Sequence, residues 1–250
     1  MKKIIFLGLL SFLIAAVWQL PLTFAKPYVE KYVQGLELNN VNGTIWNGSA
    51  QDVTHRGQDF GHISWKVNPL KSLVSLSLTT AFKINGKPLT AEGIAAITPR
   101  KKMILDNTNF DMDASYLNNF QKQAKLSGEL QGTIHHAEIE KDQLPVIDAD
   151  INWKQGKVSS MLLKLSAGDY HAKIRPNENG LHIEPSSSDA PIQLSGTVDI
   201  DKDWLYKPNL KVNSKDQGIA GLLKFAGKPQ PDGSILMNKS LDLKPFLNLQ

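Results

Sequence analysis

Apolar and polar residues alternate along most of the chain after its first 35 residues. In residues 147–154, every second side chain is apolar and the side chains between them are polar; the apolar set is Ile147, Ala149, Ile151 and Trp153. A second set in residues 74–84 comprises Val74, Leu76, Leu78, Phe82 and Ile84. A period of two places alternate side chains on opposite faces of a β-strand. The pattern therefore predicts antiparallel sheets with one face on a core and one in water.

Turn dipeptides separate these alternating runs. Asn-Gly or Asp-Gly pairs occur at residues 42–43, 47–48, 85–86, 179–180 and 232–233. Such pairs tolerate the positive φ of tight hairpin turns. The clearest hairpins are centred on Asn85-Gly86 and Asn179-Gly180, and we expect a meander of antiparallel strands.

Three stretches have helical rather than alternating patterns. Residues 26–34 form a short amphipathic stretch that suits a stalk before the β region, and residues 113–125 are expected to cap one half as a helix. Residues 217–225 have the strongest helical pattern, and Gly227 follows as an expected C-cap.

Part of the β sequence occurs twice. Gly43-Thr44-Ile45 precedes Trp65 by 22 positions (65 − 43), and Gly132-Thr133-Ile134 precedes Trp153 by 21 positions (153 − 132). Each tryptophan lies in an Ile-x-Trp-Lys segment. The similarity predicts two related β halves, residues 26–140 and 141–250, with Trp65 and Trp153 at equivalent, largely buried positions.

The N-terminus contains an apolar segment. Lys2 and Lys3 precede residues 4–20, which contain no charged side chain. At ~1.5 Å per residue, a helix over residues 4–25 would cross a ~30 Å hydrocarbon layer. A cleaved signal peptide with a cut after Ala25 is one interpretation. The length of the run, and Phe24 just before that cut, favour an uncleaved transmembrane helix.

An anchor of this kind defines the topology. Residues 1–3 would be a cytoplasmic tail, residues 4–25 a single-pass helix in the cell inner membrane, and the rest of the chain periplasmic. Both interpretations place residues 26–250 outside the cytoplasm.

Composition excludes several classes of function. The 250-residue chain has a formal charge of +4 and no basic run with interleaved aromatic residues, so no nucleic-acid partner is expected. It contains no cysteine, which excludes disulfides, thiolate catalysis and cysteine-bound zinc.

Candidate chemical groups are few. His135 and His136 are neighbours, and adjacent strand residues point to opposite faces, so they do not form a joint metal site. Asp148 with Asp150, and Asp199 with Asp201, share strand faces, as glycoside hydrolysis or calcium binding would require. Both pairs lie opposite apolar positions with lysines nearby, which indicates a solvated outer face. We therefore expect no catalytic, cofactor-binding or metal-binding residues.

The first glycine-rich segment is the most specific. Its pattern is Gly-Thr-Ile-Trp-Asn-Gly-Ser-Ala from residue 43, followed by Gly-x-Ile-x-Trp-x-Val-x-Pro from residue 61. The pattern resembles the type II secretion system protein N family, and the likeness continues through the second tryptophan strand. The motif residues are Gly43, Thr44, Trp46, Gly48, Gly61, Trp65, Pro69 and Trp153. Trp46, Trp65 and Trp153 suit either core packing or an aromatic ligand shelf.

The resemblance implies a role and a set of partners. It implies a non-enzymatic inner-membrane accessory or assembly subunit that supports export of folded proteins across the outer membrane. Its partners would be other secretion components and inner-membrane lipids, and no catalytic residue or cofactor comes with the family.

The resemblance also leaves an alternative function open. The family looks akin to AsmA-like proteins, whose curved sheets form lipid-accommodating grooves. The alternative is therefore a periplasmic lipid-handling module with an acyl chain on a concave apolar face.

Overall fold

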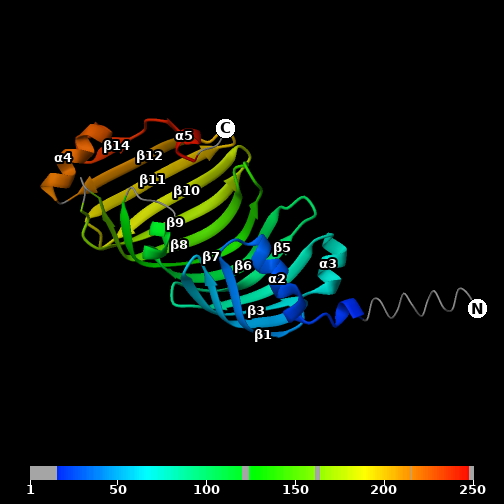
Figure 1. The fold of residues 1–250 in the computed structure, drawn as a ribbon. Coiled ribbons are helices and arrows are strands. Elements are labelled where there is room, and N and C mark those ends of the chain that lie inside the picture. The colour runs from blue at the N-terminus through cyan, green and yellow to red at the C-terminus, as the bar shows by residue number, and fades with distance from the viewer. Residues whose placement is uncertain (1–15, 120–123, 161–163, 215, 248–250) are drawn as a thin grey trace, which may run out of the picture. The chain divides into compact units, whose positions relative to one another are not determined.

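A computed structural model describes residues 16–119, 124–160, 164–214 and 216–247 (Figure 1). This part of the chain is mainly β, with fifteen strands ordered as an open antiparallel sheet and few short helices. Nearly every strand follows its neighbour in sequence, as the predicted meander requires. The alternating pattern and the turn dipeptides thus predicted the fold class correctly.

The chain divides into two compact units, residues 1–92 and 93–250. The boundary that the repeat suggests, near residue 140, lies within the second unit, in the turn between two long paired strands. Those strands pair from Lys125 to Glu138 on one side and from Val146 to Ser159 on the other, which keeps this region in one unit.

From Leu22 onward, the first unit contains two helices and four strands, and a fifth strand crosses the boundary. In chain order these are α2 (Leu22–Tyr32), β1 (Leu36–Gly43), β2 (Asn47–His55), β3 (Gln58–Val67), α3 (Pro69–Ser75), β4 (Leu78–Asn85) and β5 (Leu89–Ile97). A small core forms where Leu38 meets Ala50 and Val53, with Phe60 and Ile63 packed against it.

Helix α3 corrects one prediction. The alternation of residues 74–84 suggested a continuous strand, but Val74 lies in α3 and β4 begins only at Leu78. The side chain of Asn68 accepts a hydrogen bond from the Lys71 N–H at 2.9 Å, which caps the helix. Pro69 follows at the first helical position, where its fixed φ and missing N–H cost little.

The second unit contains the long strands. They are β6 (Met103–Asp113), β7 (Lys125–Ile139), β8 (Val146–Ser159), β9 (Gly168–Asn177), β10 (Gly180–Ser188), β11 (Ile192–Asp201) and β12 (Leu205–Ser214). Each pairs antiparallel with the next, and β7 to β12 lie side by side in Figure 1. Val198, Leu210 and Val212 form its buried cluster.

Short elements complete the second unit. They are η1 (Ala114–Asn119), α4 (Gln217–Ala226), β13 (Lys228–Pro229), β14 (Ile235–Met237), β15 (Leu241–Asp242) and α5 (Lys244–Leu247). The helix predicted at residues 217–225 is α4, with Asp216 as N-cap and Gly227 at its C-terminus. The helix expected in residues 113–125 is a short 3₁₀ helix, η1.

Within the described residues, no helix has both the length and the apolar character needed to cross a bilayer. Most of the span expected at residues 4–25 falls in residues 1–15, outside that part of the chain. Its last residues contact the β strands instead: Pro21 forms a β-bridge with Thr44, and Leu22 is only 3 % exposed.

Candidate functional site

The first motif attaches the N-terminal segment to the first unit. The indole N–H of Trp46 donates to the Val17 carbonyl at 2.9 Å, and its ring stacks on Trp18. The Ile45 N–H donates to the Leu20 carbonyl at 3.2 Å. We call this set of contacts between residues 17–22 and residues 44–48 the N-terminal joint. It fixes the direction in which the chain enters the β structure.

A tight turn presents Ile45 and Trp46 to the N-terminal segment. The Thr44 N–H donates to the Asn47 carbonyl at 2.9 Å, and the Asn47 N–H donates to the Thr44 hydroxyl oxygen at 3.1 Å. Gly43 enters the turn at φ +85°, and a Cβ there would lie 2.3 Å from the Asn47 carbonyl oxygen. Only glycine fits this position without displacing the turn.

Trp65 supports the joint from the neighbouring strand. It pairs with Gly48 across β2 and β3, and its indole N–H donates to the Ile45 carbonyl at 3.0 Å. A Cβ on Gly48 would lie 2.8 Å from the Trp65 ring and 3.2 Å from the Leu22 side chain. The glycine therefore leaves the space that Trp65 and Leu22 occupy.

The remaining motif residues of the first unit also shape the backbone. Gly61 lies where the register of β2 and β3 shifts, and its N–H donates to an Asp59 carboxylate oxygen at 2.7 Å. Pro69 begins α3, as described above. The structure thus brings Gly43, Thr44, Trp46, Gly48 and Trp65 together at the joint, while Gly61 and Pro69 lie elsewhere along β3 and after it.

Trp153 belongs to the second unit and has a similar local setting. Its indole N–H donates to the Ser127 carbonyl at 3.1 Å, and its ring lies 5.7 Å from that of Tyr170 on the next strand. Trp65 likewise pairs with an aromatic residue on the next strand, Phe82. Both tryptophans are half-buried rather than largely buried. Their environments resemble packing positions in which the N–H has a fixed partner.

An open pocket of about 480 Å³ lies beside the joint. Asn42, Ser49, Ser64 and Lys83 form one cross-strand row along its wall, and Lys66 also lines it. Hydroxyl, amide and ammonium groups line the pocket together with the rings of Trp65 and Phe82, and the Lys83 ammonium pairs with Glu92 at 3.0 Å. Sequence reasoning missed this pocket, because the only signal was a run of polar positions on the outer face.

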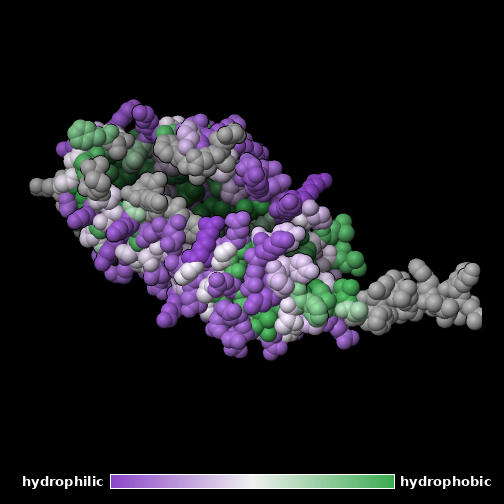
Figure 2. All heavy atoms as spheres, viewed as in Figure 1, coloured by the Kyte–Doolittle hydropathy of each residue, from purple (hydrophilic) through white to green (hydrophobic). Residues whose placement is uncertain are grey.

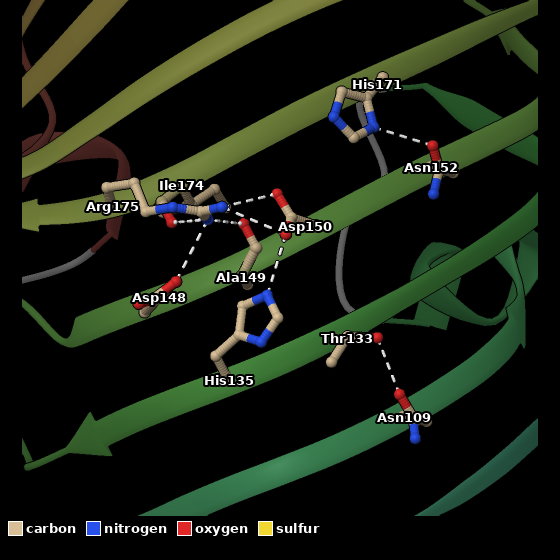
Figure 3. A network of polar contacts seen from close by, with 10 residues as sticks. All are labelled: Asn109, Thr133, His135, Asp148, Ala149, Asp150, Asn152, His171, Ile174 and Arg175. Atoms are coloured by element: carbon tan, nitrogen blue, oxygen red, sulfur yellow. Dashed lines mark hydrogen bonds and ion pairs between the residues drawn. The ribbon is translucent and has the colours of Figure 1, made fainter.

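A network of ion pairs crosses the outer face of the second unit (Figure 3). Arg175 on β9 donates to both carboxylate oxygens of Asp150 at 2.9 and 3.2 Å, and lies 3.2 Å from Asp148. His135 on β7 completes the set, 2.9 Å from Asp150. The hydrogen bond between His135 and Asp150 is the largest cause of a lowered pKa at Asp150, and the hydrogen bonds from Arg175 lower this pKa further. Both aspartates are thus paired with the guanidinium of Arg175.

His136 and His182 lie on this face as well and have carboxylate partners. The opposite faces predicted for His135 and His136 are wrong, because a register shift between Ile134 and His136 interrupts the alternation of β7. His136 lies 2.6 Å from Asp106, and this hydrogen bond raises the pKa of His136. His182 lies 2.7 Å from Asp199, which raises its pKa in the same way. Each pair joins adjacent or nearby strands of the sheet. In the described ranges, no group of three or more His, Asp or Glu side chains is arranged to hold a metal ion.

Comparison with known proteins identifies the family. The family model described as "Type II secretion system (T2SS), protein N" matches residues 34–238. A relative named type II secretion system protein N, from Pectobacterium carotovorum subsp. carotovorum, is 21% identical over 210 residues, covering 82% of this chain and 83% of the relative. No solved structure matches. Because the family model covers most of the chain, including every motif residue named above, the protein belongs to the type II secretion system protein N family.

Proposed function

We propose that the protein is a non-enzymatic accessory subunit of the type II secretion system, anchored in the inner membrane by its N-terminal segment. Its folded residues lie in the periplasm and support export of folded proteins across the outer membrane. Family membership supports the secretion role. The N-terminal joint is the structural observation that supports the anchored arrangement.

The joint suits a chain that leaves a membrane. Residues 4–20 are uncharged, and as a helix they would extend about 25 Å, close to the hydrocarbon thickness of a bilayer. The joint extends from Val17 to Leu22 and therefore includes the last residues of this segment. A direct attachment of this kind keeps the β structure close to the membrane surface.

Contacts with other secretion subunits require accessible surfaces. The outer edge of β1 is partly covered, because the Leu38 N–H donates to the Glu30 carboxylate of α2 at 2.7 Å. Strand addition at that edge would have to displace α2. Helix α4 offers a more open surface, since Phe225 is 92 % exposed and Leu222 lies on the same helix. We propose α4 as a contact with another subunit of the system.

A signal-peptide exchange tests the anchored secretion role. In a strain lacking the gene, we expect the full chain to restore release of folded exoproteins. Replacing residues 1–16 with a cleaved signal peptide should still deliver the β structure to the periplasm and fail to restore release. Full restoration by the released form would show that anchoring is dispensable. Retained secretion in the deletion strain, with no crosslinks from Phe225 to other subunits, would refute the secretion role itself.

Topology is tested separately. A periplasm-dependent reporter fused after Gln250 should be active, and N-terminal sequencing of the membrane-fraction protein should begin at the first residues of the chain. A start at Lys26 in a soluble periplasmic fraction would refute the anchor and leave export intact.

The second unit favours lipid handling as a second candidate function. One face of β6 to β11 has large apolar side chains that are only half-buried: Phe110, Leu130, Ile151, Tyr170, Ile183, Leu194 and Ile200. Figure 2 shows hydrophobic residues within a hollow over these strands. Such a face would suit an acyl chain.

A matched pair of substitutions tests this candidate. Ile151→Asp alters the apolar face, whereas Asn152→Asp alters the neighbouring outward position. Lipid handling predicts that Ile151→Asp alone reduces the amount of lipid purified with the protein. Equal lipid content in both variants would refute it.

A further inference from the structure

Helix α3 turns polar side chains toward the protein and apolar side chains toward solvent, which is the reverse of most surface helices. The Ser72 hydroxyl oxygen accepts a hydrogen bond from the Thr79 N–H at 3.0 Å, and the Ser75 hydroxyl lies 2.6 Å from that of Ser77. Ser77 and Thr79 are buried and lie 3.1 Å apart through their hydroxyl oxygens. The side of α3 that meets the protein is therefore hydroxyl-rich.

The apolar side chains of α3 point away from the protein. Leu70, Leu73, Val74 and Leu76 are between 73 and 87 % exposed. A helix on the surface of a soluble protein ordinarily turns its apolar stripe inward. Figure 2 shows this end of the first unit as a hydrophobic patch. An exposed cluster of this kind on a short segment marks a contact surface.

The local backbone holds these side chains in place. Asn68 caps the start of α3, and Leu76 ends it at φ +49°, with its N–H donating to the Ser72 carbonyl. A leucine rarely adopts this left-handed conformation. The exposed cluster is thus built on an ordered turn of helix.

The surrounding sequence carries only positive charge. Residues 60–91 contain Lys66, Lys71, Lys83 and Lys87 and no aspartate or glutamate, and of these lysines Lys83 pairs with Glu92 at 3.0 Å. Lys66 and Lys71 flank the start of α3 and are both exposed. Leucines beside lysines suit an interface that is apolar in its interior and anionic at its surface, as is the surface of a bilayer that contains anionic phospholipids.

Helix α3 also lies next to the point where the N-terminal segment joins the protein. The Val67 N–H donates to the Trp46 carbonyl at 2.7 Å, and α3 begins two residues after Val67. Trp46 in turn contacts Val17 and Trp18. The N-terminal segment and α3 are therefore connected through a single residue, Trp46.

We propose that α3 is a second membrane contact, which inserts Leu70, Leu73, Val74 and Leu76 among the acyl chains while Lys66 and Lys71 meet anionic headgroups. This inference rests on the membrane anchor proposed above. The N-terminal anchor and α3 lie on either side of Trp46, and together they fix the tilt of the first unit relative to the membrane. A single anchoring helix would leave the first unit free to rotate.

Single cysteines test the proposal, because the chain has no other thiol. The full chain with Val74→Cys carries an environment-sensitive fluorophore and is reconstituted in vesicles of anionic phospholipid that contain an acyl-chain quencher. The control is Lys87→Cys, an exposed position beyond the opposite end of β4. We expect quenching at residue 74 to be at least about threefold stronger than at residue 87, because the apolar side of α3 would lie among the acyl chains and residue 87 would lie in water. Lys66→Gln with Lys71→Gln should weaken it.

Vesicle flotation separates the two proposals. Protein that floats with the vesicles while residue 74 is quenched no more than residue 87 would overturn the α3 contact, leave the anchor in place and assign the patch to a protein partner. Protein that does not float would overturn the anchor, and the α3 contact with it.

Discussion

The indole rings of Trp46 and Trp18 stack with their centroids 5.7 Å apart and their planes inclined by 16°. The two residues are far apart in sequence, and the stack lies beside the hydrogen bond from Trp46 to Val17. Together these contacts turn a motif typical of the family into an attachment point for the N-terminal segment.

Removing the Trp46 side chain should loosen the N-terminal joint. Trp46→Ala eliminates a stacked aromatic pair and a hydrogen bond, together worth about 1–3 kcal/mol of local stability. We expect amide hydrogen exchange at Ile45, whose N–H bonds to Leu20, to become roughly 5- to 150-fold faster. Trp153→Ala, in the second unit, serves as the control and should leave this amide unchanged. Equal protection in Trp46→Ala would show that the joint holds without the tryptophan.

Adding one methyl group at Gly48 should destabilise the first unit. The new Cβ would lie 2.6 Å from the Thr44 carbonyl oxygen and 2.8 Å from the Trp65 ring. Overpacking of this kind costs about 1–3 kcal/mol, measurable by urea denaturation. Gly221→Ala is the matched control, because its Cβ would meet nothing within 4 Å in helix α4. That substitution should raise stability by about 0.5–1 kcal/mol, and a loss equal to that of Gly48→Ala would contradict the packing argument.

Trp65 and Trp153 should respond alike to substitution. Phenylalanine at either position retains much of the packing but leaves the carbonyl of Ile45 or Ser127 without its indole donor, at a cost of about 1–2 kcal/mol. Thermal or urea unfolding measures the loss. Phe225→Ala, on the exposed side of α4, should change stability by less than about 0.5 kcal/mol. A comparably small effect at both tryptophans would favour an aromatic ligand shelf.

The His182–Asp199 pair should make stability depend on pH. Asp199 raises the folded-state pKa of His182 above its ordinary value of 6.5, so the folded state binds the proton more tightly than the unfolded state. This contribution is fully present below about pH 6.5 and is lost as the pH rises through the folded-state pKa. Asp199→Asn should therefore lower stability at about pH 5.5 and have a smaller effect at about pH 8.5. NMR titration of His182 gives the direct measurement, and an unchanged pKa in the variant would refute the assignment.

Arg175 should stabilise β8 and β9 through its geometry as well as its charge. Arg175→Lys keeps the cation but loses the fork that reaches Asp148, Asp150 and the Ala149 carbonyl together. Because these side chains are partly exposed, we expect a loss of roughly 1 kcal/mol in urea denaturation. A double-mutant cycle with Asp150→Asn should show coupling between the two sites. Additive effects would mean that the pair contributes no stability of its own.

The alternating pattern predicted most strands and hairpins because side-chain direction in a strand depends only on local backbone geometry. The Asn179-Gly180 hairpin and helix α4 followed from residues next to one another in the chain. Helix α3 was missed even though its signal is also local. Asn68 and Pro69 begin a helix, but the apolar alternation of the next residues imitates a strand.

These local patterns did not predict which side chains contact one another between strands. The sequence alone indicated that Asp148 and Asp150 share a face, but Arg175 meets them only because β8 and β9 pair in one particular register. Trp46 was recognised as part of a motif, whereas its contacts with Val17 and Trp18 depend on how the chain folds back across 29 residues. A one-residue change of register would move each of these side chains to the opposite face of its strand. The sequence by itself thus determined which segments are strands and which family motif they carry, and the tertiary structure decided which side chains meet, because register depends on the packing of the whole sheet.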